Sequence, residues 1–119
     1  MPNHDTRTYV KAMVQALDSK RGEDIQVLKV GDLTSIAEYF VICTANSTTQ
    51  VKTLADEVEF RLKTDYNVVP HHVEGHDSAS WILIDYGFAL GHVFLESARE
   101  FYSLEKLWKD ATAIPTDEL

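Results

Sequence analysis

The sequence lacks the features that mark several classes of protein. It has one cysteine, Cys43, in the apolar run YFVICTA, so no internal disulfide can form and a buried, unreactive thiol in a reducing compartment is expected. The N-terminus MPNHDTRTYV has neither the apolar core of a signal peptide nor an arginine-rich amphipathic pattern. No segment approaches the length needed to span a bilayer. These absences predict a cytoplasmic protein without membrane contact.

The signatures of common catalytic sites are missing as well. The chain has no GxGxxG or GxxxxGK[ST] phosphate loop, no DxD or DxE carboxylate pair for two metal ions, and no GxSxG elbow. Ser80, Asp85 and His92 have the residue types of a hydrolase triad, but a triad is defined by geometry and residue types alone are weak support. The sequence therefore predicts neither an enzyme nor a bound cofactor.

A histidine-rich segment, HHVEGHD at residues 71–77, is the strongest candidate for a metal site. His72, Glu74 and His76 would point to the same side of an extended chain, which could gather ligands. The spacing matches no HExxH motif, and Gly75 favours a turn. An exposed loop that carries histidines is the favoured interpretation, so no metal site is predicted.

Bases are scarce in the C-terminal part of the chain. The formal net charge is −8, and residues 71–119 hold nine acids against three bases, whereas residues 1–70 hold ten acids against eight bases. Nucleic-acid affinity depends mainly on lysines and arginines that neutralise phosphates. We therefore expect little direct contact with nucleic acid, and a basic protein as the more plausible macromolecular partner.

The first half of the chain shows a helix, two strands and a second helix. An apolar stripe at helical spacing predicts a helix over residues 6–19, capped by Asp5 or Thr6 and ended near Gly22. β-Branched and apolar runs predict strands at 25–30 and 38–45. Ser47 and Gln50 have capping-box spacing and predict a helix that runs to about residue 65. The missing glycines and lysine at this junction favour plain capping over an anion site.

The second half is predicted to contain a short edge strand at 68–69, strands at 81–85 and 90–95, and a helix capped by Ser97 and Glu100. The tail at 110–119 has no periodicity and is expected to be mobile. Together these elements predict a single α/β domain over residues 1–109, with a mixed sheet of four or five strands and packed helices.

Side-chain alternation divides the strands at 81–85 and 90–95 into two faces. One face is purely apolar and consists of Ile82, Ile84, Val93 and Leu95. The other face carries aromatic rings, a carboxylate and an imidazole, and consists of Trp81, Leu83, Asp85, His92 and Phe94. Such a mixture is typical of a surface that is partly solvated and partly covered by another molecule.

Two interpretations of His92 and Asp85 remain open from the sequence. Either they form a hydrogen-bonded pair across the two strands, or they contact a partner. Trp81 and Trp108 could both be core residues. Trp81 is favoured as a contact residue, because a fully buried face would not readily accept Asp85.

Several blocks occur in an order that resembles a known family. They are GDLTSIAEYFVICTANST, VEG at 73–75, WILIDYG, HVF at 92–94 and AREFYSLEKLW. This succession resembles the ribosomal silencing factor family, also called RsfS or Iojap, over about residues 5–109. Each block alone is weak, but the combination is specific.

The resemblance implies a fold like that of nucleotidyltransferases without the catalytic carboxylates, and a role without catalysis. It implies binding to the large ribosomal subunit through its ribosomal protein fourteen, on the face that joins the small subunit. Occupation of that face would block subunit joining and lower translation when nutrients are scarce. Mitochondrial relatives act in large-subunit assembly, and the missing presequence favours the bacterial form.

The chain departs from the family pattern after WILIDYG. The family usually continues there with an aspartate and a run of valines, whereas this chain has residues 88–91, FALG. The departure predicts a changed turn between two unchanged strands. The histidines of HHVEGHD are also outside the family pattern, which further disfavours a metal site.

Charge and resemblance together predict an acidic, aromatic contact surface, since ribosomal proteins are generally basic. The candidate partner-binding residues are Trp81, Asp85, Tyr86, His92, Phe94, Glu96, Tyr102, Leu107 and Trp108. Two alternatives remain: a nucleotide-binding or nucleotidyl-transferring enzyme with a divergent site, and a self-associating module that forms a homodimer through the same aromatic face.

Overall fold

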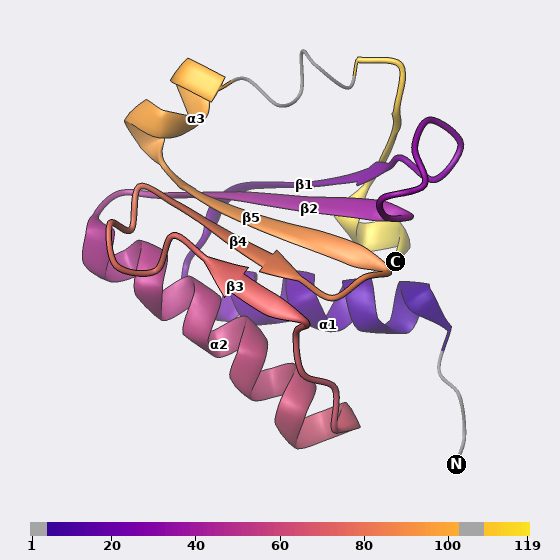
Figure 1. The fold of residues 1–119 in the computed structure, drawn as a ribbon, viewed down its shortest axis with the longest axis horizontal. Helices are drawn as coiled ribbons and strands as arrows, with labels where there is room; N and C mark the ends of the chain where they lie inside the picture. The colour runs from indigo at the N-terminus through magenta and orange to yellow at the C-terminus, as the bar shows by residue number, and fades with distance from the viewer. Residues whose placement is uncertain (1–4, 103–108) are drawn as a thin grey trace.

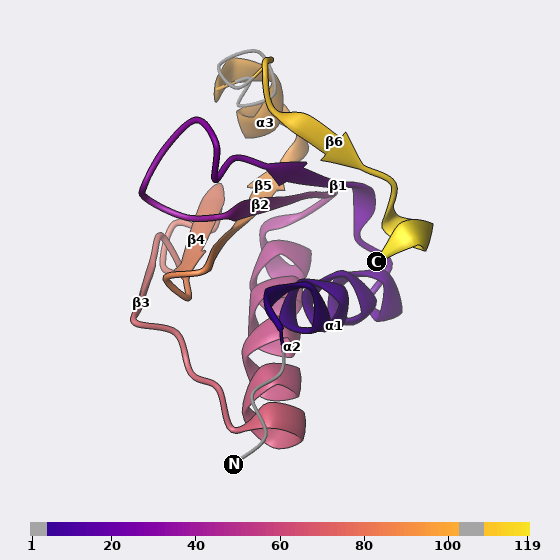
Figure 2. The same ribbon diagram turned by 90° about the vertical axis from the view of Figure 1, so that its right-hand side faces the viewer.

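The computed structural model of the chain describes residues 5–102 and 109–119, with side chains described as far as Arg99 in the first of these ranges. A mixed β-sheet lies at its centre, with two long helices on one side and a short helix on the other (Figures 1 and 2). In chain order the elements are α1 (Thr6–Ser19), β1 (Glu23–Lys29), β2 (Tyr39–Ala45), α2 (Thr48–Tyr66), β3 (His72–Glu74), β4 (Trp81–Asp85), β5 (Ala89–Leu95), α3 (Glu96–Tyr102), β6 (Thr112–Ile114) and a final 3₁₀ turn, η1 (Thr116–Glu118).

The strands are ordered β3-β4-β5-β2-β1-β6 across the sheet. β2 and β5 are parallel, and the other neighbouring strands are antiparallel. A parallel pair needs a long crossover, and here the crossover contains α2, β3 and β4. The predicted single α/β domain with a mixed sheet is confirmed.

Short-range capping fixes the starts of α1 and α2. The Asp5 side chain accepts a hydrogen bond from the backbone N–H of Thr8, and the Ser47 hydroxyl accepts one from the N–H of Gln50 at 3.1 Å. The Gln50 side chain reaches back and accepts from the N–H of Asn46 at 2.7 Å. Both predicted helix starts are confirmed, because each cap satisfies N–H groups that have no partner inside the helix.

The sheet has six strands among the described residues, so the predicted four or five is too low. The additional strand is β6, in a tail for which the sequence predicted no regular structure. It pairs antiparallel with β1, with Val27 opposite Ile114 and Lys29 opposite Thr112. A three-residue edge strand has no local periodicity to detect, and its partner lies far away in the sequence.

Two further boundaries differ from prediction. The short edge strand lies at His72–Glu74 instead of 68–69, because it pairs with β4 in a register that places Val73 opposite Ile84. α3 begins at Glu96, so Ser97 lies inside the helix instead of capping it.

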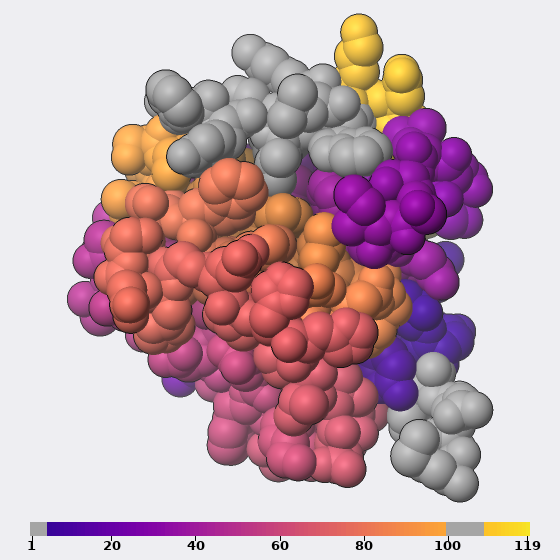
Figure 3. Space-filling model, in the orientation of Figure 1, coloured from indigo at the N-terminus to yellow at the C-terminus, as the bar shows by residue number. Residues whose placement is uncertain are grey.

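The sheet has two different faces, and most of the candidate contact residues on β4 and β5 belong to only one of them. The helix-side face packs against α1 and α2, and its fully buried residues include Val41, Cys43, Ile82, Ile84 and Val93. The open face is the opposite one, where α3 lies, and its buried hydrophobic cluster consists of Leu28, Val30, Ala37, Phe40, Ile42, Leu90 and Phe94. In the space-filling view, residues 70–90 form a broad central part of one surface of the molecule (Figure 3).

Candidate partner-binding surface

The predicted division of β4 and β5 into two faces is confirmed. Ile82, Ile84 and Val93 belong to the helix-side core, and Leu95 packs against it. Trp81 and Leu83 pack on the open face around Phe94. The antiparallel register explains this, because Trp81 is opposite Phe94 and Leu83 is opposite His92 without an intervening bulge.

The open face carries an aromatic row that crosses three strands. Phe40 from β2, His92 and Phe94 from β5, and Trp81 from β4 form this row. The Trp81 and Phe94 rings are stacked with centroids 4.9 Å apart, and the His92 ring lies 4.9 Å from Phe40 in an edge-to-face arrangement. Phe94 is fully buried, whereas Trp81 is half-buried. The row therefore begins inside the protein and ends at an indole that solvent can reach.

His92 lies in the middle of this row and is only 4% exposed. Its Nδ1 atom accepts a hydrogen bond from the Trp81 indole N–H at 3.1 Å. Burial among aromatic rings lowers the pKa of the imidazole to about 4, because a low-dielectric environment disfavours the charged form. The ring is therefore neutral near pH 7, with its proton on Nε2, since Nδ1 must offer a lone pair to the indole.

Asp85 does not pair with His92, so the first of the two interpretations left open by the sequence, a cross-strand pair, is wrong. The register places Asp85 opposite Leu90, and His92 opposite Leu83. Asp85 instead accepts a hydrogen bond from the backbone N–H of Gly87 at 2.8 Å, where Gly87 has a φ of +83°. Its other carboxylate oxygen lies 3.6 Å from the His72 imidazole. The carboxylate thus stabilises the turn after β4 and remains partly exposed.

Tyr86 lies on the other side of the sheet from Trp81, which corrects its assignment to the aromatic contact surface. It is 3% exposed, belongs to the helix-side core and stacks on Phe88. Even-numbered residues of β4 point toward the helices, and Tyr86 continues that alternation. Burial raises the pKa of its phenol, so the hydroxyl stays protonated. The strands on both sides of the altered turn are intact, as predicted.

Four predicted contact residues come from the segment after β5. Glu96 is exposed at the start of α3. The Tyr102 side chain lies outside the described part of the structure, as do Leu107 and Trp108. Glu96 is therefore the member of this group whose side chain is seen at the surface.

Arg99 was not predicted, although it attaches α3 to the sheet. It is 7% exposed, and its guanidinium donates hydrogen bonds to the Thr44 hydroxyl at 2.6 Å and to the Asp24 backbone carbonyl at 2.7 Å. A further nitrogen lies 3.4 Å from the Asp24 carboxylate. These partners are 55 and 75 residues away in the sequence, so no local pattern signals them.

A small hollow lies beside Trp81. It is lined by Glu74, Gly75, Trp81 and Leu83, and its volume is about 180 Å³. An indole and an aliphatic side chain next to a carboxylate suit a partner side chain with an apolar stem and a positive end. A lysine or arginine side chain of a partner could therefore enter this hollow on the open face.

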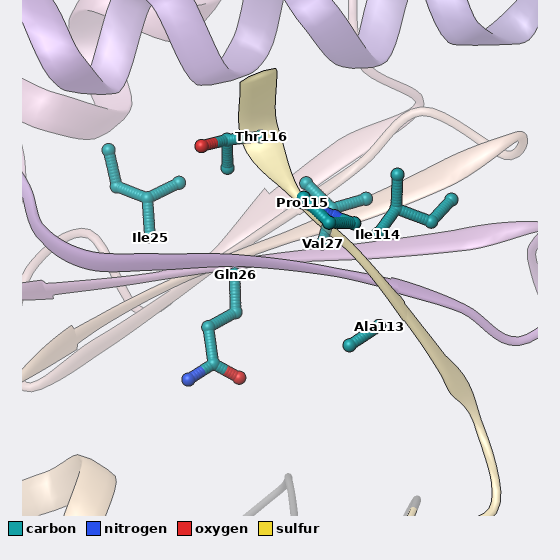
Figure 4. A pocket seen from close by; sticks show the side chains of 7 residues that line it. All are labelled: Ile25, Gln26, Val27, Ala113, Ile114, Pro115 and Thr116. Carbon is teal, nitrogen blue, oxygen red and sulfur yellow. The ribbon is translucent and has the colours of Figure 1, made fainter. Parts of the chain in front are cut away.

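A second hollow, at the junction of β1 and β6, has a different character. It is lined by Ile25, Gln26, Val27, Ala113, Ile114, Pro115 and Thr116, and Figure 4 shows that Gln26 and Ala113 point away from the side on which Ile25 and Thr116 lie. The lining has an amide and a hydroxyl as its polar groups and has no titratable side chain. Among the described residues that line this hollow, no acid or base lies beside the Thr116 hydroxyl to activate it.

The histidine-rich segment forms separate polar pairs. His76 lies 3.0 Å from Asp56 of α2, and His72 lies 3.9 Å from Glu74. Within residues 5–102 and 109–119, no group of three or more His, Cys, Asp or Glu side chains is arranged to hold a metal ion. Nor does any described helix have the length and apolar composition for crossing a bilayer.

Comparison with known proteins decides the family. The family model described as ribosomal silencing factor during starvation matches residues 3–119. The chain belongs to the ribosomal silencing factor family. Its relatives include the ribosomal silencing factor RsfS of Bacillus subtilis, which is 37% identical over 111 residues, covering 93% of this chain and 93% of the relative.

The fold agrees with this assignment to the ribosomal silencing factor family. A crystal structure of a protein from Chromobacterium violaceum matches with a TM-score of 0.86 and 35% identity, over 89% of this chain and 88% of that one. A second crystal structure, from Bacillus halodurans, matches with a TM-score of 0.80 and 30% identity, over 92% of this chain and 99% of that one. The family resemblance found in the sequence blocks is therefore confirmed.

Proposed function

We propose that this chain is an inhibitory ribosome-binding factor that binds the large ribosomal subunit through its ribosomal protein fourteen. Bound there, it sterically blocks joining of the small subunit and represses translation when nutrients are limiting. Membership of the ribosomal silencing factor family supports a ribosomal role. The mechanism needs no turnover, because the degree of inhibition follows the fraction of large subunits that carry the factor.

The observation that carries this proposal is the half-buried Trp81 on the open face, with the Glu74 carboxylate beside it in the same hollow. Trp81 would be the anchor, because large aromatics in partly preformed hollows dominate interface energetics. Asp85 and Glu96 would provide negative charge at the rim and speed the encounter with a basic partner. Tyr102, Leu107 and Trp108 complete the proposed set from the sequence.

The buried members of the predicted set have a different proposed role. Phe94 is fully buried and His92 nearly so, which means that neither side chain offers much surface to a partner. We propose that they support Trp81 from beneath. Tyr86 faces the helices, so we propose that it acts only indirectly, by supporting the turn after β4.

Sedimentation of ribosomal subunits tests the proposal directly. Purified large and small subunits are mixed with increasing amounts of the protein, and the fraction of joined ribosomes is measured on gradients. We expect joining to fall as the protein saturates the large subunit, with the protein co-sedimenting with large subunits only. Full joining at saturating protein would show that the proposed function is wrong.

Paired variants test the proposed surface. Trp81→Ala should weaken large-subunit binding at least about tenfold, the loss typical of an anchoring aromatic. Phe60→Ala is the matched control, because Phe60 is a 64% exposed aromatic on α2, on the other side of the sheet. Asp85→Lys should slow association, with Asp65→Lys of α2 as its control. Wild-type affinity in both Trp81→Ala and Asp85→Lys would show that the surface is wrongly placed.

One more variant is needed to separate the charge of Asp85 from its role in the turn after β4. Asp85→Lys also removes the acceptor for the Gly87 N–H, so a change in binding could come from a distorted turn. Asp85→Asn removes the charge and keeps an acceptor oxygen in the same place. We expect Asp85→Asn to fold like the wild type and to lose the salt-sensitive part of the association rate.

A further inference from the structure

A buried imidazole beneath a half-buried indole is not explained by packing alone. His92 is 4% exposed and is surrounded by the rings of Phe40, Phe94 and Trp81. An aliphatic side chain of similar size would fill this space without the cost of removing polar nitrogens from water. Among the described residues, Nε2 of His92 has no hydrogen-bond partner, so that cost is not fully offset.

The hydrogen bond to Trp81 is what the imidazole provides and an aliphatic side chain would not. The Trp81 indole N–H points at Nδ1 of His92 over 3.1 Å. The Trp81 indole stacks on Phe94 with an interplanar angle of 27°, and this contact fixes the plane of the indole. Stacking does not determine whether the N–H edge or the carbon edge of the ring faces inward. A directional hydrogen bond selects one of the two orientations, since the indole has a single donor.

We propose that His92 is a positioning residue for Trp81: Nδ1 of His92 holds the indole N–H inward, so that the carbon edge of the ring faces the hollow formed with Glu74, Gly75 and Leu83. This inference rests on the proposed function where it concerns the ribosome, because it deepens the role of the Trp81 surface. Its first consequence, the orientation of the indole, concerns the free protein and can be measured without a ribosome.

The electrostatic state of His92 is consistent with this role. Only a neutral imidazole has a lone pair on Nδ1, and burial keeps the pKa of His92 at about 4. The rings packed around it carry no charge, so the acceptor persists across the physiological pH range. Preorganisation of this kind lowers the entropy lost when the indole is buried at an interface.

The test uses two substitutions that differ in whether they keep the acceptor. His92→Asn places an amide oxygen near the position of Nδ1, whereas His92→Leu fills the space without an acceptor. Protein labelled with ¹⁵N-tryptophan gives two indole resonances, one for each tryptophan, and Trp81→Phe assigns them. The exchange rate and chemical shift of the Trp81 indole proton then report the hydrogen bond.

We expect His92→Leu to speed exchange of the Trp81 indole proton at least about tenfold and to shift its resonance, and His92→Asn to restore most of both. Affinity for the large subunit should follow the same order, with a loss of about tenfold in His92→Leu and partial recovery in His92→Asn. Phe40→Leu is the control, because it removes a ring that contacts His92 and leaves the hydrogen bond in place.

Two results would overturn the proposal. The first is an indole resonance that is unchanged in His92→Leu, since the hydrogen bond would then have no role in orientation. The second is wild-type binding by His92→Leu while Trp81→Ala fails to bind. Wild-type binding by Trp81→Ala is a different result, because it contradicts the proposed surface and leaves the positioning of the indole by His92 intact. It is recognised because the indole resonance still responds to His92→Leu.

Discussion

Alternate residues of β4 and β5 form the two faces of the sheet, and the two faces differ in chemistry. The helix-side residues Ile82, Ile84 and Val93 are fully or almost fully buried hydrocarbons. On the open face, the same strands present an indole, an imidazole and a carboxylate. The comparison teaches that one pair of strands can supply stability through one set of alternate side chains and leave the other set for the proposed contact with a partner.

The largest expected difference between the faces is in stability. Ile84→Ala should lower the free energy of unfolding by about 3–4 kcal/mol, because it leaves a cavity in a core that α1 and α2 enclose. Leu83→Ala, one residue earlier and half-buried on the open face, should cost about 1 kcal/mol. Urea denaturation of the two variants measures both values. Equal losses would contradict the division into a fully buried helix-side face and a half-buried open face.

Arg99→Gln should cost about 2–3 kcal/mol, because it removes charge-assisted hydrogen bonds that hold α3 on the open face and leaves the buried Thr44 hydroxyl poorly satisfied. The matched control is Arg61→Gln, whose ion pair with Glu57 lies along α2 and is partly exposed. That control should change stability by less than about 0.5 kcal/mol. Thermal unfolding of the two variants measures this difference. Similar unfolding midpoints for Arg99→Gln and Arg61→Gln would show that Arg99 does not anchor α3.

Lowering the pH should destabilise the folded protein through protonation of His92 on the open face. Its pKa is about 4 in the folded protein, below the ordinary value of 6.5, so the folded state resists protonation. The stabilisation is present above pH 6.5 and is lost as the pH falls toward 4, because the unfolded chain binds the proton first. Between pH 7.5 and pH 5 the loss should be about 2 kcal/mol.

The corresponding measurement compares the wild type with His92→Leu at both pH values, which cancels the contributions of carboxylates common to the two proteins. The wild type should lose about 2 kcal/mol more than the variant. The same loss in both proteins would mean that His92 titrates normally and is not buried as described.

Gly91→Ala should have a small effect on the free energy of unfolding, at less than about 1 kcal/mol. Gly91 lies on the helix-side face, and an added Cβ would be 3.2 Å from the end of the flexible Met13 side chain and 3.5 Å from Cβ of Ile84. Gly22→Ala is a useful contrast, because its Cβ would collide with Sγ of the buried Cys43. Denaturation midpoints should be close to the wild type for Gly91→Ala and clearly lower for Gly22→Ala.

Much of the fold could be predicted wherever a local interaction controls the structure. Asp5 and Ser47 cap helices through residues three positions away, and alternation along β4 and β5 assigned Ile82 and Trp81 to opposite faces. Within the candidate site, Trp81 was placed correctly on the open face. The family blocks also led to the ribosomal silencing factor family, whose family model matches residues 3–119.

The errors arose where distant segments meet. The Asp85 and His92 pair depended on a register that the turn at Gly87 decides, and that register places Leu90 opposite Asp85. Tyr86 is the exception, because the alternation along β4 alone already places it among the residues that face the helices. β6 and the Arg99 cluster depend on partners far away in the sequence, which no local pattern encodes.

The sequence by itself determined the helix caps, the alternation of the strands, the acidic charge and the family, since each of these depends on near neighbours or on composition. Only the tertiary structure decided which distant polar groups meet: Trp81 with His92, and Arg99 with Thr44. The physical reason is that hydrogen bonds between strands require a specific register and a distance near 3 Å. Packing of the whole sheet sets both.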